Sequence, residues 1–345
     1  MATDPKTVVL SDVHISNGAK YSWFLQSNAR DFVNMLERVL DDSSVKELVL
    51  LGDLFDLWLY PVNVVPWTVS QILQANPDVT NALRQCVQKI PKVYYIPGNH
   101  DMGVAENDLQ PFGAGDKQIR LVSPKWYSEK YQGVRYLEHG HAVDMFNAPD
   151  DSDDTIGGYP LGFFITRLTA TAEDQSEVWR KLKELYRGLA TFHMAIEPEE
   201  IARIPIGVRM VRAIMRLLRI LAEVDDGEPI RFSEPALDNK YTVGDIRNYY
   251  GSLYDRWGRQ YPDFEEFLRT VLVSVDSNGL DWYAKKLISE NAARKVVVMG
   301  HTHNSVSESE YKNDGCWCIP SALGHSDAKP SYVEIVGDSA TLISW

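Results

Sequence analysis

Histidine and aspartate side chains gather in five short clusters that lie far apart along the chain. Six of the eight histidines belong to these clusters, which are Ser11–His14 (SDVH), Gly52–Asp56 (GDLFD), Gly98–Asp101 (GNHD), His139–His141 (HGH) and Gly300–His303 (GHTH). Imidazole and carboxylate groups are ligands for Zn, Mn or Fe, and an asparagine carbonyl adds a neutral oxygen. Because no thiolate belongs to this set, it argues against a structural zinc site.

The ligand types in these clusters fit two divalent metal ions. Two ions roughly 3.5–4 Å apart can share one carboxylate and a hydroxide. Glycine stands directly beside the ligands, as Gly52, Gly98 and Gly300, where it lets backbone and metal approach closely. The clusters therefore predict a paired-metal site.

Each cluster follows a short apolar run of the kind that forms a buried strand. The runs are Thr7–Leu10, Leu48–Leu51, Val93–Ile96, Val134–Leu137 and Val296–Met299, and a last strand pattern covers Tyr332–Trp345. Apolar positions at helical spacing predict helices over about 23–40 and 69–90. This alternation is typical of a parallel sheet with crossover helices, in which ligands bind at the carboxyl ends of the strands.

Between about residues 147 and 291 the pattern changes to helices with no clear strand. Helical periodicity covers segments near 173–196, 206–224, 242–257, 264–275 and 280–291. We therefore predict an α/β core formed by residues 1–145 and 292–345, interrupted by an all-helical insertion, or cap, over residues 146–291. A length of 345 residues is compatible with one large domain that carries an insertion.

Composition narrows the class of protein further. Acidic residues outnumber basic ones by 48 to 35, and the resulting charge of −13 disfavours a protein that coats nucleic acid. The N-terminus lacks the features of a signal peptide, and no apolar run approaches the ~20 residues of a transmembrane helix, so we expect a cytoplasmic protein. Cys316 and Cys318 do not match a CxxC spacing, and we interpret them as reduced, partly buried thiols.

The motif order DxH, GDxxD, GNHD, H and GHxH resembles that of the calcineurin-like metallophosphoesterase superfamily. The resemblance covers about residues 1–145 and 292–345. It implies an α/β fold of the α+β sandwich type, with central β-sheets flanked by helices. It also implies two divalent metal ions, with Mn expected first and Fe or Zn as alternatives.

The resemblance implies seven metal ligands. They form a first set, a bridging carboxylate and a second set: Asp12, His14 and His303; Asp53; and Asn99, His139 and His301. In the HGH cluster the family pattern favours His139 as the ligand. The alternative is His141, which is otherwise a candidate substrate contact.

Two further residues take catalytic roles by the same resemblance. His100 would donate a proton to a phosphoryl oxygen or to the leaving group, and Asp56 would orient the His100 ring. A hydroxide that bridges the two metal ions would attack phosphorus in line with the leaving oxygen.

One predicted helix of the cap, 206–224, carries a basic stripe. Its members are spaced three and four residues apart and therefore share one face: Arg209, Arg212, Arg216 and Arg219. Such a stripe beside an apolar face suits an anionic amphiphile, a membrane surface or an acidic partner, and we expect Arg212 and Arg216 to contact substrate. The alternative is that the arginines pair with the acids of residues 225–228.

Within the superfamily, the chain is similar to the branch of the UDP-2,3-diacylglucosamine diphosphatases. The similar features are the GDLFDLW run, the His-Gly pair after the fourth strand and a helical lid before GHTH. The chain departs from that branch at His100, where those enzymes typically carry arginine, and in the greater length of its lid.

The function expected from these observations is metal-dependent hydrolysis of a phosphodiester or diphosphate bond in a small or lipid-like molecule. Peripheral contact with a membrane stays open, and no nucleic-acid partner is expected. The alternatives are a phosphomonoesterase or protein phosphatase, a nuclease, which the charge disfavours, and a binding scaffold that keeps the fold without metals.

Overall fold

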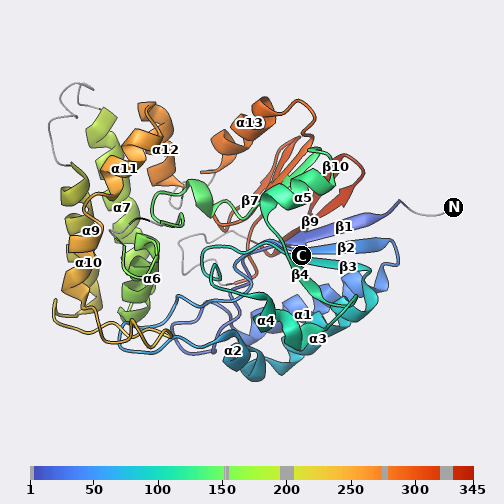
Figure 1. Ribbon diagram of the computed structural model, residues 1–345, viewed down its shortest axis with the longest axis horizontal. Helices are drawn as coiled ribbons and strands as arrows, with labels where there is room; N and C mark the ends of the chain where they lie inside the picture. The colour runs from blue at the N-terminus through green and yellow to red at the C-terminus, as the bar shows by residue number, and fades with distance from the viewer. Residues whose placement is uncertain (1–3, 151, 153–154, 195–205, 274–278, 319–328) are drawn as a thin grey trace.

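The computed structural model describes residues 4–150, 152, 155–194, 206–273, 279–318 and 329–345 of the chain (Figure 1). Its core is a sandwich of two β-sheets. The six-stranded sheet has the order β10-β9-β1-β2-β3-β4, and the four-stranded sheet has the order β5-β6-β8-β7. The strands are β1 (Lys6–Leu10), β2 (Val45–Leu50), β3 (Lys92–Tyr95), β4 (Ile119–Leu121), β5 (Arg135–Leu137), β6 (Val296–Met299), β7 (Ser305–Ser307), β8 (Tyr311–Asp314), β9 (Ser331–Val336) and β10 (Ser339–Ser344).

Most strand pairs that carry the clusters are parallel. Strands β1 to β4 pair in parallel, and the tail predicted as a strand is a hairpin, β9 and β10, that joins β1 antiparallel. In the second sheet β5 pairs with β6 in parallel, although the whole insertion separates them in the chain. The carboxyl ends of β1, β2, β3, β5 and β6 therefore open toward the same region, as the predicted alternation requires.

The strands are buried on both faces, and alternate side chains enter different cores. Val9, Val49 and Tyr94 pack between the two sheets, together with Val298 of β6. Their neighbours in the chain point to the other side and pack under the helices on the outer face, among them Val8, Leu10, Leu48 and Leu50. This two-residue period is the reason why β-branched and leucine runs form the strands.

Helices cover the outer face of the six-stranded sheet. They are α1 (Gln26–Asp41), α2 (Val69–Ala75), α3 (Pro77–Lys89), α4 (Glu106–Leu109) and the short 3₁₀ helix Gln110–Phe112. Helix α5 (Pro124–Lys130) instead packs against β5, and the 3₁₀ helix His141–Val143 adds Val143 to the core of the four-stranded sheet. The single helix predicted over 69–90 is therefore two helices. The break comes at Pro77, because proline lacks an N–H and disfavours helical backbone in the preceding residue, and Asn76 closes α2 by donating to the Ile72 carbonyl.

The described insertion contains helices but no strand; residues 223–242 form turns and one isolated bridge, Pro229 with Thr242. Its helices are α6 (Leu161–Thr171), α7 (Gln175–Met194), α9 (Ile206–Ala222), α10 (Val243–Tyr249), α11 (Leu253–Gln260), α12 (Phe264–Leu272) and α13 (Asp281–Glu290). Helix α6 has no counterpart among the predicted segments. Its residues Leu161–Ala170 are all buried, so it shows none of the one-sided periodicity by which helices are recognised. No described helix is both long and apolar enough to cross a membrane.

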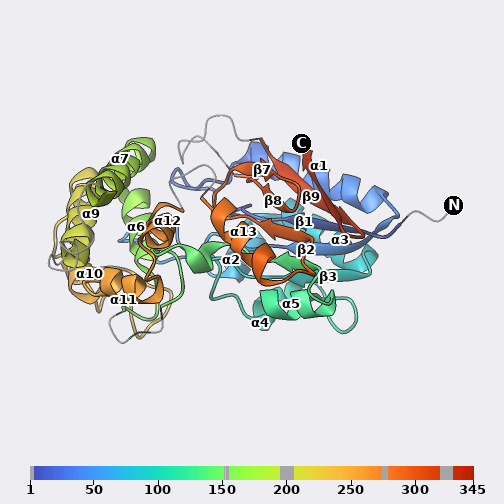
Figure 2. The ribbon, with the colours of Figure 1, turned by 90° about the horizontal axis from the view of Figure 1, so that it is seen from above.

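The helices α6 to α12 and the last helix, α13, belong to different cores. Buried side chains of α6, α7, α9, α10, α11 and α12 form one cluster, which stands beside the sandwich in Figures 1 and 2. Helix α13 instead packs Ala284 and Leu287 against Val297 and Met299 of β6. We therefore propose that the cap ends before α13, and that α13 is the crossover helix of the sandwich.

One arginine joins α6 to the core loop after β2. The Arg167 side chain is fully buried, and its Nε donates to the carbonyl of Tyr60 at 2.6 Å. Its other nitrogens donate to the carbonyls of Pro61, Val62, Val64 and Arg231. Five backbone acceptors on two loops thus converge on a single guanidinium, which ties the cap to the sandwich.

Candidate metal centre

The five clusters come together at the carboxyl ends of strands from both sheets. The seven predicted ligands lie directly after β1, β2, β3, β5 and β6, and the side chain of each is at most 9% exposed. Buried carboxylates and imidazoles at this density are costly unless they pair with charge or bind metal. The fold therefore gathers all seven side chains in one place.

The first predicted set lies around the ends of β1 and β6. The Nε2 atoms of His14 and His303 are 3.1 Å apart, and Nε2 of His303 is 3.2 Å from Oδ1 of Asp12. Nε2 of His14 is also 3.7 Å from Oδ2 of Asp53. Two imidazole nitrogens thus face two carboxylates across a space small enough for one ion.

The second predicted set shares Asp53 with the first. Oδ2 of Asp53 is 3.1 Å from Nε2 of His139, and ligand atoms of Asp53, His139 and His301 lie within 4.8 Å of one another. The amide nitrogen of Asn99 lies 3.4 Å from Asn147, and its Oδ1 is buried with no hydrogen-bond partner. Asp53 therefore lies between the two predicted ligand sets, with Oδ2 facing both His14 and His139.

The donor atoms themselves fit a cation. Nδ1 of His139 lies 2.9 Å from the Leu51 carbonyl and so carries the proton in the neutral ring, which leaves Nε2 as a lone pair directed at Asp53. Nε2 of His139 is buried and has no hydrogen-bond partner. Burial alone would lower the pKa of His139, but Asp53 and Asp12 raise it to about 10. The carboxylates thus create a potential that attracts positive charge to this point.

The backbone at the ligands is strained. Eight described residues other than glycine have a positive φ, and five of them are predicted ligands: Asp12, His14, Asp53, His301 and His303. Such conformations cost roughly 1–3 kcal/mol each and cluster at functional sites. The glycines beside the ligands have a steric role, because a Cβ at Gly98 would lie 2.2 Å from Oδ1 of Asp53 and one at Gly300 would lie 2.3 Å from Oδ2 of Asp12.

His100 lies at the rim of this cluster. Its Nδ1 is 2.9 Å from Oδ1 of Asp56, and the same oxygen accepts from the backbone N–H groups of Trp58 and Leu59. The Trp58 ring stacks on the imidazole with centroids 4.8 Å apart. Burial alone would lower the pKa of His100, but the carboxylates of Asp56 and Asp53 raise it above its ordinary value. The arrangement holds the ring in one orientation and favours its protonated form.

The two histidines of the HGH cluster have different surroundings. His139 contacts Asp53, whereas His141 does not share the ligand groups. The His141 ring lies 5.6 Å from that of His139, and its Nδ1 is buried with no hydrogen-bond partner. The geometry therefore supports His139 as the metal ligand.

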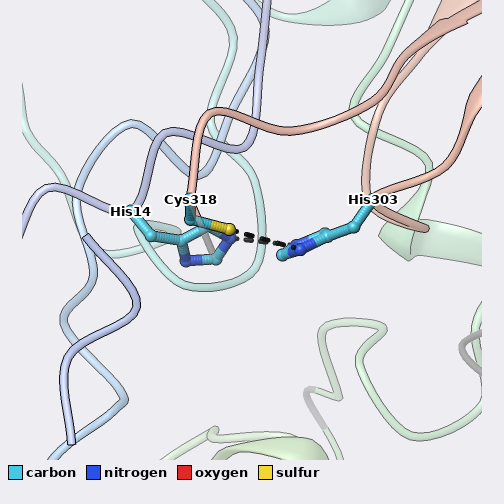
Figure 3. Close-up of side chains that lie close together, drawn as sticks. All are labelled: His14, His303 and Cys318. Carbon is cyan, nitrogen blue, oxygen red and sulfur yellow. Dashed lines mark hydrogen bonds between the residues drawn. The ribbon is translucent and has the colours of Figure 1, made fainter. Parts of the chain in front are cut away.

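Three contacts of the ligands were not anticipated from the motifs. Cys318 places its Sγ 3.5 Å from Nδ1 of His303, and possible ligand atoms of His14, His303 and Cys318 lie within 4.8 Å of one another (Figure 3). Nε2 of His301 lies 3.0 Å from Oδ2 of Asp144, and Oδ1 of Asp314 accepts a 2.7 Å hydrogen bond from Ser11 beside Asp12. The C-x-C pair was visible in the sequence, but nothing in its spacing indicated an imidazole partner.

The arginines predicted to contact substrate lie outside this cluster. Arg212 and Arg216 are exposed on α9 and line a cavity together with Arg219 and Arg247, and none of the metal-centre residues lines it. Arg219 pairs with Asp226 at 2.8 Å. This one arginine therefore behaves as in the alternative interpretation, in which the stripe pairs with the acids of residues 225–228. The side chain of Arg209 lies outside the described part of the chain.

Comparisons with known proteins bear on the family of the chain. A family model described as calcineurin-like phosphoesterase matches residues 5–197. No curated protein matches significantly, whereas 24 chains of solved structure do. One of these is nuclease MPE from Pseudomonas putida, with 21% identity and a TM-score of 0.24 over 42% of this chain and 56% of that chain. The match thus spans little more than half of the nuclease.

Proposed function

The chain belongs to the calcineurin-like phosphoesterase family, and we propose that it hydrolyses a phosphodiester or diphosphate bond with the help of two divalent metal ions. The observation that carries the proposal is the shared position of Asp53, which faces His14 on one side and His139 on the other. A single metal site would not need one carboxylate between two sets of imidazoles. The similarity to the UDP-2,3-diacylglucosamine diphosphatase branch remains a hypothesis about substrate.

Each ligand set would hold one ion. Asp12, His14 and His303 would bind the first, Asn99, His139 and His301 would bind the second, and Asp53 would contact both. Bound ions of this kind lower the pKa of a water molecule from 15.7 to roughly 7 and neutralise charge on phosphoryl oxygens. Mn is the ion we expect first, with Fe or Zn as alternatives, because the donors mix carboxylate, amide oxygen and imidazole.

In this proposal His100 supplies the proton that the leaving group takes up. Asp56 accepts from Nδ1 of His100, which leaves Nε2 of the protonated ring free to donate to the oxygen of the leaving group. Trp58 covers one face of the imidazole and limits its rotation. A positioned acid contributes typically 10²–10⁴-fold to such a reaction.

A cavity of about 420 Å³ begins at His100 and extends between the sandwich and the cap. Aromatic side chains line much of it: Trp58, Trp67, Tyr159, Phe163 and Phe232. Asp108 and Glu234 also line it, and no lysine or arginine does among the described residues. This composition supports a substrate whose organic group is apolar and carries no negative charge, and it gives no support to a nucleic-acid strand.

A phosphomonoesterase is the second candidate function. The His100–Asp56 pair favours it, because a protonated imidazole also serves a poor alkoxide leaving group.

A hydrolysis panel in Mn²⁺ tests the proposal. The substrates are bis(p-nitrophenyl) phosphate, p-nitrophenyl phosphate, a nucleoside diphosphate conjugate and a phosphatidic acid. We expect the diester or the diphosphate conjugate to give the highest kcat/KM, whereas a monoester maximum would favour the second candidate. No turnover of any substrate by protein that carries two bound metal ions would contradict both.

A further inference from the structure

Four arginines surround a second cavity, of about 440 Å³, on the cap. Arg212, Arg216 and Arg219 come from α9 and Arg247 comes from α10, and Met215, Val243 and Asn248 complete much of the wall. The spacing of three and four residues along α9 places its three arginines on one side of the helix, and the last turn of α10 supplies the fourth, Arg247. The cavity is therefore basic on two walls.

The positive charge in this cavity is not balanced. Asp226 is the one carboxylate among its described lining residues, and it already pairs with both Arg219 at 2.8 Å and Arg247 at 3.4 Å. Arg212 and Arg216 form no ion pair with any described residue. Three formal charges thus remain uncompensated here, in a chain whose net charge is −13.

The arginine cavity is separate from the metal centre. Helix α9 packs on α6, α7, α10 and α11, which are all cap helices. In both ribbon views α9 and α10 lie at the outer edge of the cap, with α6 between them and the sandwich (Figures 1 and 2). A small molecule bound between these arginines would not reach the metal ligands.

We propose that this cavity is a binding site for a phosphate-bearing anion, independent of the metal centre and of the proposed reaction. Guanidinium groups pair with phosphate oxygens through two parallel hydrogen bonds, and several guanidiniums can share one phosphate group. The cavity volume fits a headgroup or a small metabolite. The apolar side of α9 cannot insert into a bilayer, because Met210, Ile214 and Leu218 are buried within the cap.

Titration calorimetry with inorganic pyrophosphate tests the site in the full-length protein. EDTA is present throughout, so that the metal centre holds no cation that could recruit the anion. We expect saturable binding that weakens as salt increases, and a loss of at least 10-fold in affinity for Arg212→Ala combined with Arg216→Ala. Both side chains are exposed, so the double variant should keep its melting temperature.

A matched control removes the same charge elsewhere. Arg30 on α1 and Arg259 on α11 are exposed and do not line the cavity. The Arg30→Ala, Arg259→Ala variant should bind pyrophosphate as the unchanged protein does. Equal losses in the two double variants, or no binding by the unchanged protein, would overturn the proposal.

A second variant predicts a gain rather than a loss. Asp226→Asn removes the carboxylate that competes for Arg219 and Arg247 and keeps the size of the side chain. Pyrophosphate should then bind several-fold more tightly. Unchanged or weaker binding in Asp226→Asn would show that the arginines do not act together on the anion.

Vesicle flotation distinguishes the two sources of phosphate. Vesicles of phosphatidylcholine with one-fifth phosphatidic acid are compared with pure phosphatidylcholine. Flotation with the acidic vesicles that pyrophosphate competes away, and that the Arg212→Ala, Arg216→Ala variant loses, identifies a lipid headgroup. Pyrophosphate binding without flotation identifies a free phosphate compound, and both results support the anion site.

Discussion

The sandwich and the cap use left-handed backbone for different purposes. In the sandwich, five residues with positive φ are predicted metal ligands. In the cap, the described residues of this kind other than glycine are Glu223, directly after α9, and Asn239, in the turn before α10. In the sandwich this strain is therefore concentrated where side chains must converge on a point, whereas in the cap it occurs where the chain reverses.

The two regions also differ in their buried polar groups. The sandwich buries a whole set of carboxylates and imidazoles around the candidate metal centre, whereas the fully buried charge of the described cap helices is Arg167, whose five acceptors are backbone carbonyls. In the proposed function the sandwich would perform the chemistry, and the cap would help to select the substrate through Tyr159, Phe163 and Phe232, which line the cavity at His100.

The largest expected effect follows from replacing Asp53, the carboxylate that lies between the two predicted ligand sets. Asp53→Ala should abolish turnover, by at least 10³-fold, and remove much of the bound metal, because this side chain faces both ligand sets. The loss of turnover is measured as kcat for an aryl diester, and the loss of metal is measured by metal analysis of the purified variant. Asp31→Ala, an exposed acid on α1, is the control. Near-normal turnover with two metal ions bound in Asp53→Ala would end the two-metal interpretation.

Replacement of His100, at the rim of the cluster, should affect catalysis without affecting metal binding. His100→Asn should lower kcat by on the order of 10²–10⁴ while metal content stays the same, since His100 donates a proton and holds no ion in this proposal. Loss of metal in this variant would instead make His100 a ligand, a role that its distance to His14 and Asp53 also permits.

Arg167 joins the cap to the sandwich, and its replacement should destabilise the cap. Arg167→Met removes five hydrogen bonds and leaves the carbonyls of Tyr60 and Val64 without a donor among the described residues. Unsatisfied buried groups cost about 1–3 kcal/mol each, so we expect the free energy of unfolding to fall by roughly 3 kcal/mol.

Urea unfolding followed by tryptophan fluorescence measures this loss, with metal content determined on the same samples. Retained metal with an early cap transition would sharpen the contrast between the regions. Arg180→Met, on the exposed side of α7, should change stability by less than ~0.5 kcal/mol and serves as the control. Loss of metal together with the cap would show that the sandwich depends on it.

The smallest expected effect is a change in Mn²⁺ affinity when the thiol of Cys318 is removed. When Nε2 of His303 binds metal, its Nδ1–H donates to Sγ of Cys318, which fixes the ring. Cys318→Ala should therefore weaken Mn²⁺ affinity by about 10-fold, the lower end for such contacts. Cys86→Ala, at a buried thiol of α3 that belongs to none of the described groups of possible metal ligands, should leave the affinity unchanged. Equal affinities in the two variants would assign Cys318 to packing.

The sequence predicted those parts of the fold and site whose signals are local. Asp12, Asp53 and His301 each stand next to a strand run and a recognisable turn, so their place at a sheet edge followed from neighbouring residues alone. Asp144, Cys318 and Asp314 reach the ligands through tertiary contacts that leave no local pattern. Helix α6 was not predicted because it is buried on every side and so lacks a one-sided apolar pattern. The surroundings of Arg212 could not be predicted either, because they depend on the packing of α10 against α9.

The pairing of β5 with β6 has a consequence for the order in which the protein folds. Val296 pairs with Arg135, so this ladder closes only after the whole cap has been synthesised. Strands β1 to β4 use contacts much nearer in the chain and can assemble earlier. His301 and His303 follow β6, so the full ligand set of the proposed centre would exist only after this ladder has closed. A metal bound there would stabilise only the fully assembled chain, by mass action.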